Sequence, residues 1–293
     1  MKSARPIPFI KCQGFGNDFI LIDEKQLEGL NIPYVDFAVQ ICTRKFAVGA
    51  DGLIIWNPGP EPDSFAARIF NADGSEAESS GNGIRCLGAA LFHGTPGLPD
   101  TVRIQTLGGR KQITRLAAED NLYTFRTNLG PPEFEPSRIP FIPGDGGRRG
   151  TPEHTVLVDQ TSFHVTPLSL GNPHCVIRTE AIDFNLLYGV GPSLEKHPQF
   201  PARTNVEFLR VANRSTIEIA IWERGVGHTL SSGTGSAAAA VAAIANGWTD
   251  SPVQVQMEGG EVLVRWDKGG DVIQDGKAQF VFSGWIESRA LRY

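Results

Sequence analysis

The sequence predicts an α+β fold made of two similar domains, each a mostly antiparallel β-sheet wrapped around a central helix. Strand-like segments greatly outnumber helix-like ones along the 293 residues, which argues against a parallel, doubly wound sheet. The motif Ser79-Ser80-Gly81-Asn82-Gly83 returns later in the chain as Ser231-Ser232-Gly233-Thr234-Gly235, which indicates an internal repeat. Small apolar residues follow each copy, at 84–91 and 236–244, and suit a helix that a curved sheet surrounds.

The first domain, residues 1–130, combines short strands with one helix before the motif and one after it. Strands separated by Gly-rich turns are predicted at 8–11, 19–22, 53–56, 65–70, 102–106, 111–115 and 122–126. The spacing of Phe37, Val39 and Ile41 predicts a helix over 35–44. The second helix begins at the first motif, with a serine as its N-cap.

The second domain, residues 131–282, repeats this plan after a segment rich in proline and glycine. That segment, 131–152, is expected to form an exposed connection between the domains. Strands are predicted at 155–159, 161–168, 175–178, 205–211, 216–222, 253–257, 261–266 and 278–286. An irregular helix is predicted at 185–195, and a central helix from the second motif to about residue 245. The last strand, near 283–293, can return to the first domain.

Composition excludes several classes of protein. The net charge is −5 and no basic cluster occurs, which argues against nucleic acid and anionic membrane surfaces as partners. Residues 1–11 lack the apolar core of a signal peptide, and the longest apolar stretch, 237–244, is far too short to cross a bilayer. The four cysteines form no CxxC pair. We therefore expect a cytoplasmic protein with free thiols, no membrane partner and no metal site.

The two motifs carry the main functional signal. The N-terminus of a helix presents unpaired backbone N–H groups and a partial positive charge, so it binds carboxylates and phosphates. Two such ends in one chain suggest two half-sites for one anionic ligand, in the cleft between the domains. The alternative is that both motifs are only Gly-rich turns that cap buried helices.

Other polar residues near the motifs have a structural and a functional interpretation. Glu223 and Arg224 precede the second motif, where they could form a surface ion pair or let the arginine bind a ligand carboxylate. His174 follows a proline in a turn, and a lone histidine is more often a satisfied structural group than a catalyst. Four asparagines in turns or at strand edges are typical turn residues and also candidate ligand contacts: Asn17, Asn71, Asn172 and Asn205.

Taken together, the motifs resemble the diaminopimelate epimerase family over nearly the full length of the chain. The matching stretches in the first half are 14–19, 49–52, 70–76 and 80–86, and those in the second half are 130–132, 171–174, 204–206, 222–225 and 233–235. The resemblance implies two pseudo-symmetric domains and a homodimer. It also implies an isomerase that needs no cofactor and converts LL-diaminopimelate to the meso form, for lysine and cell-wall precursors, with two bases on opposite faces of the α-carbon.

The resemblance also implies roles for individual residues. The backbone at Gly81-Asn82 and at Gly233-Thr234 would hold the reacting carboxylate of a small amino acid substrate. His174 and Glu223 would flank the reacting amino acid. The distal amino acid end would be held by the four asparagines and the arginine named above: Asn17, Asn71, Asn172, Asn205 and Arg224.

One departure from the family concerns the two base positions. The family has a catalytic cysteine before Gly-Asn-Gly and another before Gly-Thr-Gly, whereas this chain has Ser80 and Ser232. A thiol has a pKa of about 8.5 that a helix N-terminus lowers further, while a serine hydroxyl is a far weaker acid. Cys86 lies about a turn and a half into the first helix and Cys12 precedes the hairpin tip, so neither is expected to replace the missing thiols.

Three explanations for the serines stay open. The chain can be an engineered inactive form, a natural branch that uses serines, or an amino-acid-binding protein that has lost the chemistry. The function predicted at family level is epimerisation of diaminopimelate, with Ser80 and Ser232 in the two base positions. The alternative enzyme class is a cofactor-independent isomerase or racemase of another small amino acid or carboxylate.

Overall fold

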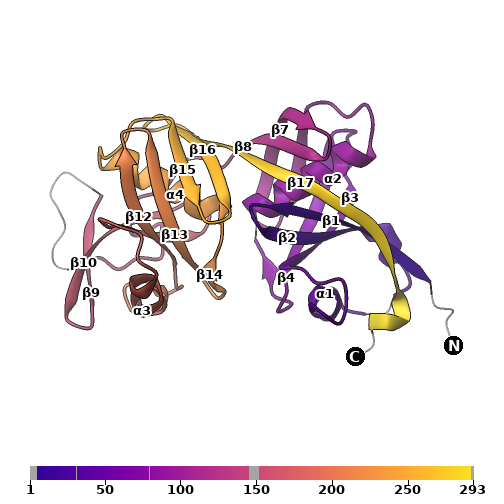
Figure 1. The fold of residues 1–293 in the computed structure, drawn as a ribbon, viewed down its shortest axis with the longest axis horizontal. Coiled ribbons are helices and arrows are strands. Elements are labelled where there is room, and N and C mark those ends of the chain that lie inside the picture. The colour runs from indigo at the N-terminus through magenta and orange to yellow at the C-terminus, as the bar shows by residue number, and fades with distance from the viewer. Residues whose placement is uncertain (1–4, 31, 79, 145–151, 292–293) are drawn as a thin grey trace. The chain divides into compact units, whose positions relative to one another are not determined.

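The computed structural model describes residues 5–30, 32–78, 80–144 and 152–291. They group into two compact units (Figure 1). Unit 1 consists of Met1–Thr127 and Gly276–Tyr293, and unit 2 of Asn128–Asp275. Unit 1 is therefore built from both ends of the chain. The boundaries expected from the sequence, after residues 130 and 282, lie a few residues later.

Unit 1 contains a mixed sheet with two α-helices. Its elements are β1 (Pro6–Gly14), β2 (Asn17–Asp23), the 3-10 helix η1 (Glu24–Leu27), α1 (Tyr34–Cys42), β3 (Gly52–Pro58), β4 (Ser64–Asn71), β5 (Glu76–Ala77), α2 (Gly81–Gly94), β6 (Thr101–Thr106), β7 (Gly109–Glu119), β8 (Leu122–Asn128), most of β17 (Val272–Glu287) and the 3-10 helix η2 (Ser288–Leu291). The described pairs β2–β3 and β4–β6 are parallel, and β1–β2, β1–β17, β3–β4 and β6–β7 are antiparallel.

Helix α2 is the central helix of unit 1 and is buried from Gly81 to Phe92. It packs on β1, β2 and β7. Gly88 permits this close approach, because a Cβ there would lie 2.5 Å from Cδ1 of Ile113 and 3.1 Å from the ring of Phe125. Helix α1 belongs to a second apolar cluster, in which its Phe37 packs with residues of β2 and β3.

Unit 2 repeats this plan with its own pair of helices. Its elements are β9 (His154–Val158), β10 (Thr161–Ser169), β11 (Pro173–Arg178), α3 (Phe184–Glu195), β12 (Asn205–Asn213), β13 (Thr216–Glu223), β14 (Gly227–Thr229), α4 (Gly233–Ala245), β15 (Val253–Met257), β16 (Gly260–Trp266) and the start of β17. The described pairs β11–β12 and β13–β15 are parallel. The pairs β9–β10, β10–β11, β12–β13, β13–β14, β15–β16 and β16–β17 are antiparallel.

Helix α4 is the central helix of unit 2. Its residues Ser236–Ile244 are all buried, and it contacts strands β10 to β13, β15 and β16 (Figure 1). Alanine side chains keep the helix thin enough for strands to approach it from several directions. Helix α3 packs elsewhere, where Leu187 and Leu194 join Val206 and Phe208 of β12. The predicted fold class, with a sheet wrapped around a central helix in each unit, is confirmed.

Two local predictions were wrong. The last strand begins at Val272 rather than 278. The segment 131–152 is not simply an exposed connection, because Ile139 and Phe141 are buried in the core cluster of unit 2. Residues 145–151 of that segment, and Ser79 of the first motif, lie outside the described residues.

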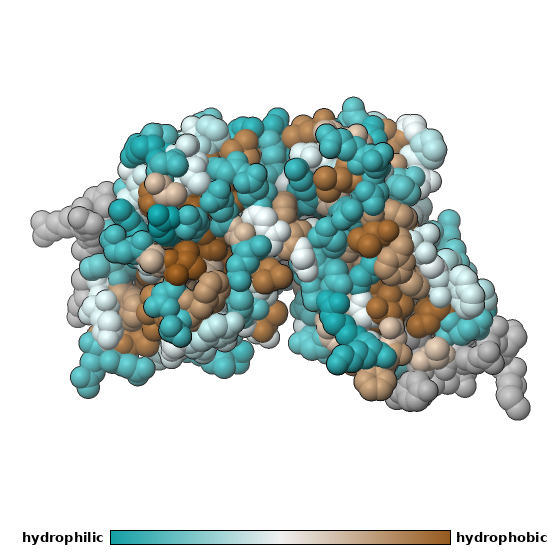
Figure 2. Space-filling model, in the orientation of Figure 1, coloured by the Kyte–Doolittle hydropathy of each residue, from teal (hydrophilic) through white to brown (hydrophobic). Residues whose placement is uncertain are grey.

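The surface of each unit is mixed in character. On the face shown in Figure 2, hydrophilic residues surround separate apolar patches. Large apolar residues that are exposed include Phe46 and Trp285 in unit 1 and Val226 in unit 2. Within the described residues, no helix is long and apolar enough to span a membrane.

Candidate functional site

Ser80 and Ser232 cap the two central helices with the same geometry. Both have extended backbone, with φ, ψ of −142°, 120° at Ser80 and −139°, 131° at Ser232. The Oγ of Ser80 accepts a hydrogen bond from the backbone N–H of Gly83 at 3.1 Å. The Oγ of Ser232 accepts one from Gly235, also at 3.1 Å. The predicted N-caps are therefore confirmed, and each hydroxyl keeps its proton to donate elsewhere.

In unit 1 the structure brings Asn17 and Asn82 together. The Nδ2 of Asn82 donates to Oδ1 of Asn17 at 3.3 Å. The Nδ2 of Asn17 in turn donates to Oδ2 of Asp51 at 3.0 Å, and Arg44 holds the other oxygen of Asp51 at 2.9 Å. Asp51 thus fixes the orientation of the Asn17 amide. Gly81 is buried in the first turn of α2, beside Asn82.

Arg85 is a residue of this region that sequence reasoning missed. It is fully buried in α2 and donates to Oδ1 of Asn82, and its guanidinium lies 5.6 Å from the centre of the Phe15 ring. Burial lowers the pKa of Arg85 to about 10, which leaves it charged at neutral pH. A fixed positive charge therefore lies in the second turn of α2, behind Asn82.

Asn71 forms a turn of its own at the end of β4. Its Nδ2 donates to Oγ of Ser75 at 2.9 Å. Asp73 accepts from both the backbone N–H and the hydroxyl of Ser75, and these hydrogen bonds lower the pKa of Asp73. The structure thus places Asn71 in a rigid turn, in a hydrogen-bond group separate from that of Asn17 and Asn82.

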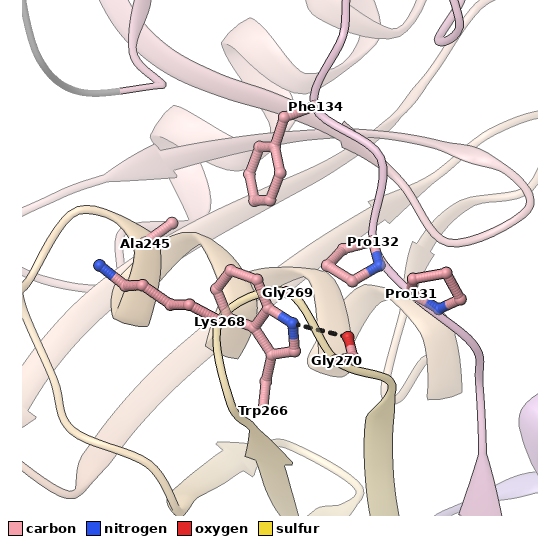
Figure 3. Close-up of a pocket in the computed structure, with 8 residues that line it drawn as sticks. All are labelled: Pro131, Pro132, Phe134, Ala245, Trp266, Lys268, Gly269 and Gly270. Atoms are coloured by element: carbon pink, nitrogen blue, oxygen red, sulfur yellow. Dashed lines mark hydrogen bonds between the residues drawn. The ribbon is translucent and has the colours of Figure 1, made fainter.

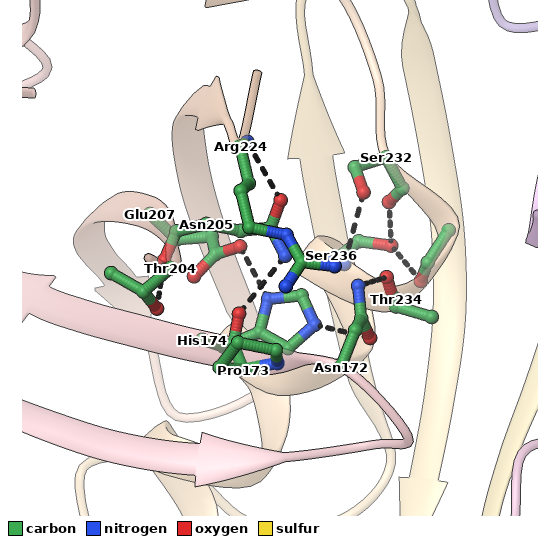
Figure 4. Close-up of polar contacts among 12 residues, drawn as sticks. Asn172, Pro173, His174, Thr204, Asn205, Glu207, Arg224, Ser232, Thr234 and Ser236 are labelled. Carbon is green, nitrogen blue, oxygen red and sulfur yellow. Dashed lines mark hydrogen bonds and ion pairs between the residues drawn. The ribbon is translucent and has the colours of Figure 1, made fainter. Parts of the chain in front are cut away.

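In unit 2 a chain of hydrogen bonds leads from the interior to the start of α4 (Figure 4). The Nδ1 of His174 lies 2.7 Å from Oε1 of Glu207, and both side chains are fully buried. The Nε2 of His174 lies 3.0 Å from Oδ1 of Asn172. The Nδ2 of Asn172 donates to Oγ1 of Thr234 at 3.3 Å. His174, Asn172 and Thr234, predicted separately from the sequence, therefore form one connected group, and Glu207 is a member that the sequence reasoning missed.

The two units repeat one contact. In each, an asparagine at the start of a turn or strand bonds at 3.3 Å to the side chain two residues after the capping serine. The pairs are Asn17 with Asn82 and Asn172 with Thr234. Each asparagine is held from its other end, by Asp51 directly in unit 1 and by Glu207 through His174 in unit 2.

Asn205 links the strand ends near Arg224. Its Nδ2 donates to the carbonyl of Pro173 at 2.9 Å, and its Oδ1 accepts from the backbone N–H of Arg224 at 2.9 Å. Nη1 of Arg224 donates to the carbonyl of Ala202 at 3.3 Å. Glu223 ends β13 and is half-buried. Asn205 therefore fixes the backbone from which the arginine side chain extends.

The first turn of α4 has internal support that the sequence did not reveal. The hydroxyl of buried Ser236 lies 2.7 Å from the carbonyl of Ser232 and 3.0 Å from that of Gly233. Gln274 donates to the carbonyl of Gly233 at 2.8 Å and to the Ser236 hydroxyl at 3.0 Å. These bonds fix the carbonyl groups of Ser232 and Gly233, so the first turn of α4, which carries the unpaired N–H groups, is held in place.

A separate hollow of about 280 Å³ lies in unit 2 (Figure 3). It is lined by Pro131, Pro132, Phe134, Ala245, Trp266, Lys268, Gly269 and Gly270. Trp266 is held there by a hydrogen bond from Nε1 to the carbonyl of Gly270 at 3.1 Å. Among the described residues that line this hollow, none is a predicted site residue and Lys268 is the one ionisable group.

Known proteins share this combination of motifs and fold. The family model described as diaminopimelate epimerase matches residues 9–135 and 166–281. The chain belongs to the diaminopimelate epimerase family. The curated diaminopimelate epimerase of Pelotomaculum thermopropionicum is 40% identical over 278 residues, covering 94% of this chain and 97% of the relative. That of Acaryochloris marina is 42% identical over 291 residues, covering 96% and 99%.

Membership of the diaminopimelate epimerase family makes the protein an isomerase of the epimerase type. The fold extends to more distant enzymes. The crystal structure of a probable proline racemase from Agrobacterium radiobacter K84 superposes with a TM-score of 0.68 at 15% identity, covering 96% of this chain and 92% of that one. At this identity the likeness shows the fold alone.

The four cysteines of this diaminopimelate epimerase family member are free and buried. Burial raises the pKa of Cys12 and of Cys42 to about 12, and it raises the pKa values of Cys86 and Cys175 well above the ordinary range. None of these thiols is therefore a thiolate base at neutral pH. Among the described residues no cluster of three or more His, Cys, Asp or Glu could hold a metal ion.

Proposed function

We propose that the protein binds diaminopimelate and epimerises LL-diaminopimelate to the meso form by two-base proton transfer, with Ser80 and Ser232 in the base positions. The observation that carries the proposal is the repeated cap, in which each serine starts a buried central helix with the same 3.1 Å bond. The curated relatives of this chain, whose length it covers almost completely, are named diaminopimelate epimerase.

The two helix ends suit the reacting carboxylate. Backbone N–H groups at Gly81-Asn82 and Gly233-Thr234 lie in the first turns of α2 and α4, where the helix dipole favours an anion. The amide of Asn17 is oriented by the ion-paired Asp51 and that of Asn172 by the buried His174, which lowers the entropy lost when a ligand binds. We assign both helix ends to one ligand, and the cleft between the domains stays a prediction from the sequence.

The distal end of the substrate is assigned to Arg224 and to four asparagines: Asn17, Asn71, Asn172 and Asn205. Asn205 acts in this proposal mainly by fixing the Arg224 backbone, since both polar atoms of its amide already have protein partners. His174 and Glu223 flank the reacting amino acid. A homodimer and a cytoplasmic location remain predictions from the family resemblance.

The serines are expected to slow the reaction. Inversion requires one group to remove the α-proton and another to deliver a proton to the opposite face. A serine hydroxyl is a far weaker acid than a thiol, so the alkoxide that would act as base is rarely populated at neutral pH. The hydrogen bond that each Oγ accepts from a backbone N–H, together with the helix dipole, stabilises an alkoxide only in part. No buried cysteine offers a thiolate in their place.

The test is exchange of the substrate α-hydrogen in deuterated solvent, beside calorimetric binding of diaminopimelate. We expect measurable binding and slow exchange that is specific for diaminopimelate within a panel of amino acids. Rapid exchange on another amino acid or carboxylate would show that the pocket serves a different substrate. Absence of both binding and exchange for diaminopimelate would refute the proposal.

A further inference from the structure

Glu207 is a fully buried acid whose described hydrogen-bond partner is His174. On β12, its neighbours Val206 and Phe208 pack in the apolar cluster that contains α3. Glu207 lies instead against α4, where a Cβ at Gly235 would come within 2.8 Å of its Oε1. Its second oxygen has no hydrogen-bond partner among the described residues. Burial of a carboxyl group in this way is unfavourable unless the group is paired or neutralised.

The hydrogen-bond directions determine where the protons lie. The Nδ2 of Asn172 faces Thr234, so its carbonyl oxygen faces Nε2 of His174. A carbonyl oxygen only accepts, and Nε2 must therefore carry a hydrogen. One further proton lies between Nδ1 of His174 and Oε1 of Glu207, 2.7 Å apart. With that proton the pair is neutral overall, whichever of the two atoms holds it.

The surroundings favour retention of the shared proton. Burial raises the pKa of Glu207, and loss of the proton would leave a net negative charge in the interior. On β11 the neighbouring ionisable group is Cys175, whose pKa is itself raised by burial and by Glu207. Residues 233–240 of α4 contain no ionisable side chain, and β13 places Ile221 opposite Glu207.

We propose that Glu207 is a positioning residue for the helix end at α4. By holding His174 as an Nε2–H donor, it fixes Asn172 with its carbonyl oxygen inward and its amide hydrogens toward Thr234. The helix end then presents amide donors, which suit a carboxylate, instead of an acceptor that would repel it. The link to a carboxylate ligand rests on the proposed function, whereas the protonation state of His174 does not.

The test uses the full chain labelled with ¹⁵N-histidine, and its nitrogen spectra identify which ring nitrogens of His174 carry a hydrogen. In the unmodified protein Nε2 should carry a hydrogen, and Nδ1 should show the hydrogen bond to Glu207. In Glu207→Gln an amide of similar size can donate to Nδ1, so the Nε2–H form should persist. In Glu207→Leu the shared proton is lost, and His174 should exchange between its two tautomers while the side-chain resonance of Asn172 shifts.

Glu258→Gln is the matched control, because Glu258 pairs with His228 in the same unit at an accessible position. It should change the signals of His228 and leave those of His174 unaltered. Absence of the hydrogen on Nε2 of His174 in the unmodified protein, or an unchanged His174 in Glu207→Leu, would overturn the proposal. If Glu207→Leu does not fold, the His174 spectra of the unmodified protein and of Glu207→Gln still test the proposal.

Calorimetry with diaminopimelate separates this proposal from the proposed function. Affinity should fall about tenfold in Glu207→Leu and stay within about twofold in Glu207→Gln. Failure of the unmodified protein to bind would refute the proposed function, while the spectra would still decide the role of Glu207. Equal affinity in Glu207→Leu despite an altered His174 would overturn the link between Glu207 and ligand binding.

Discussion

The Oγ of Ser232 lies 3.1 Å from the backbone nitrogen of Gly235 and accepts the hydrogen bond that starts α4. The oxygen that caps the helix is thus the atom at the position where the family resemblance predicts a catalytic sulfur. Oxygen is the better acceptor for a helix cap, and sulfur is the better acid and base. Helix stability and proton transfer therefore make opposite demands on this position, and likewise on Ser80.

Restoring both thiols should restore turnover. We expect Ser80→Cys with Ser232→Cys to raise the rate of diaminopimelate epimerisation by orders of magnitude, because a thiolate near a helix N-terminus is populated near neutral pH. Each single cysteine should recover little, since groups that act on one carbon as a unit are not additive. Solvent deuterium exchange measures all four forms. No gain in the double variant would indicate that the pocket serves another substrate.

The caps can be tested separately through stability. Ser232→Ala should lower the free energy of unfolding by about 1 kcal/mol, because the N–H of Gly235 loses its acceptor. Ser232→Gly is the control, since glycine at an N-cap lowers stability by only about a few tenths of a kcal/mol. Urea denaturation compares the two variants. A Ser232→Ala variant as stable as the unmodified protein would show that the hydroxyl does not stabilise α4.

Arg224 should bind the distal carboxylate of the ligand. Arg224→Met should weaken diaminopimelate binding by about 1.5–3 kcal/mol, the usual contribution of a hydrogen bond to a charged group. Arg203→Met is the control, because Arg203 is an arginine of the same unit that lies 3.6 Å from Glu195. Calorimetry gives both affinities. Unchanged affinity in a folded Arg224→Met variant would mean that this arginine is structural or that the ligand differs.

Gly88 should be intolerant of a side chain. Gly88→Ala should destabilise unit 1 by about 1–3 kcal/mol, because the new methyl group would overlap Cδ1 of Ile113. Gly94, at the end of the same helix, has open space where its Cβ would lie. Gly94→Ala should therefore be neutral or stabilising. Thermal denaturation measures both, and a tolerated Gly88→Ala would show that α2 is not tightly enclosed.

Asp18 should contribute stability that depends on pH. Burial alone would raise its pKa, but hydrogen bonds from Arg44 and Lys11 outweigh burial and leave the pKa below its ordinary value. The contribution of the carboxylate is therefore fully present above the unfolded pKa of about 3.9, and it is lost as the pH falls through the folded pKa. The stability difference between the protein and Asp18→Asn should be largest near pH 7 and shrink toward pH 3. A constant difference would contradict this assignment.

The regular parts of the fold were predictable because local patterns decide them. The two motifs placed both central helices, since a capping serine and a run of small residues are local signals. The early start of β17 was missed because Gly276 weakens its strand pattern. The reason for a glycine at this position is a contact far away in sequence, because a Cβ there would lie 3.1 Å from the guanidinium of Arg85.

The site was predictable only as separate residues. His174 and Asn172 lie in a turn motif. Glu207, which contacts His174, comes from another strand, and its sequence context is also typical of a surface acid. The parallel pairing of β11 with β12 brings them together, and a single sequence does not reveal that pairing. A charged residue within the otherwise apolar run 206–209 was the one available signal.

Strand β17 imposes an order on folding during synthesis. Its residues from Gln279 to Glu287 pair with β1, whose residues are made earlier, while all of unit 2 lies between them in the chain. At ribosomal speeds of about 5–20 residues per second, β1 waits on the order of tens of seconds for its neighbour. Unit 2 can fold while unit 1 still has an open sheet edge. A nascent chain stalled before β17 would therefore expose that edge to chaperones and to other unfinished copies, until a strand made after unit 2 completes the sheet of unit 1.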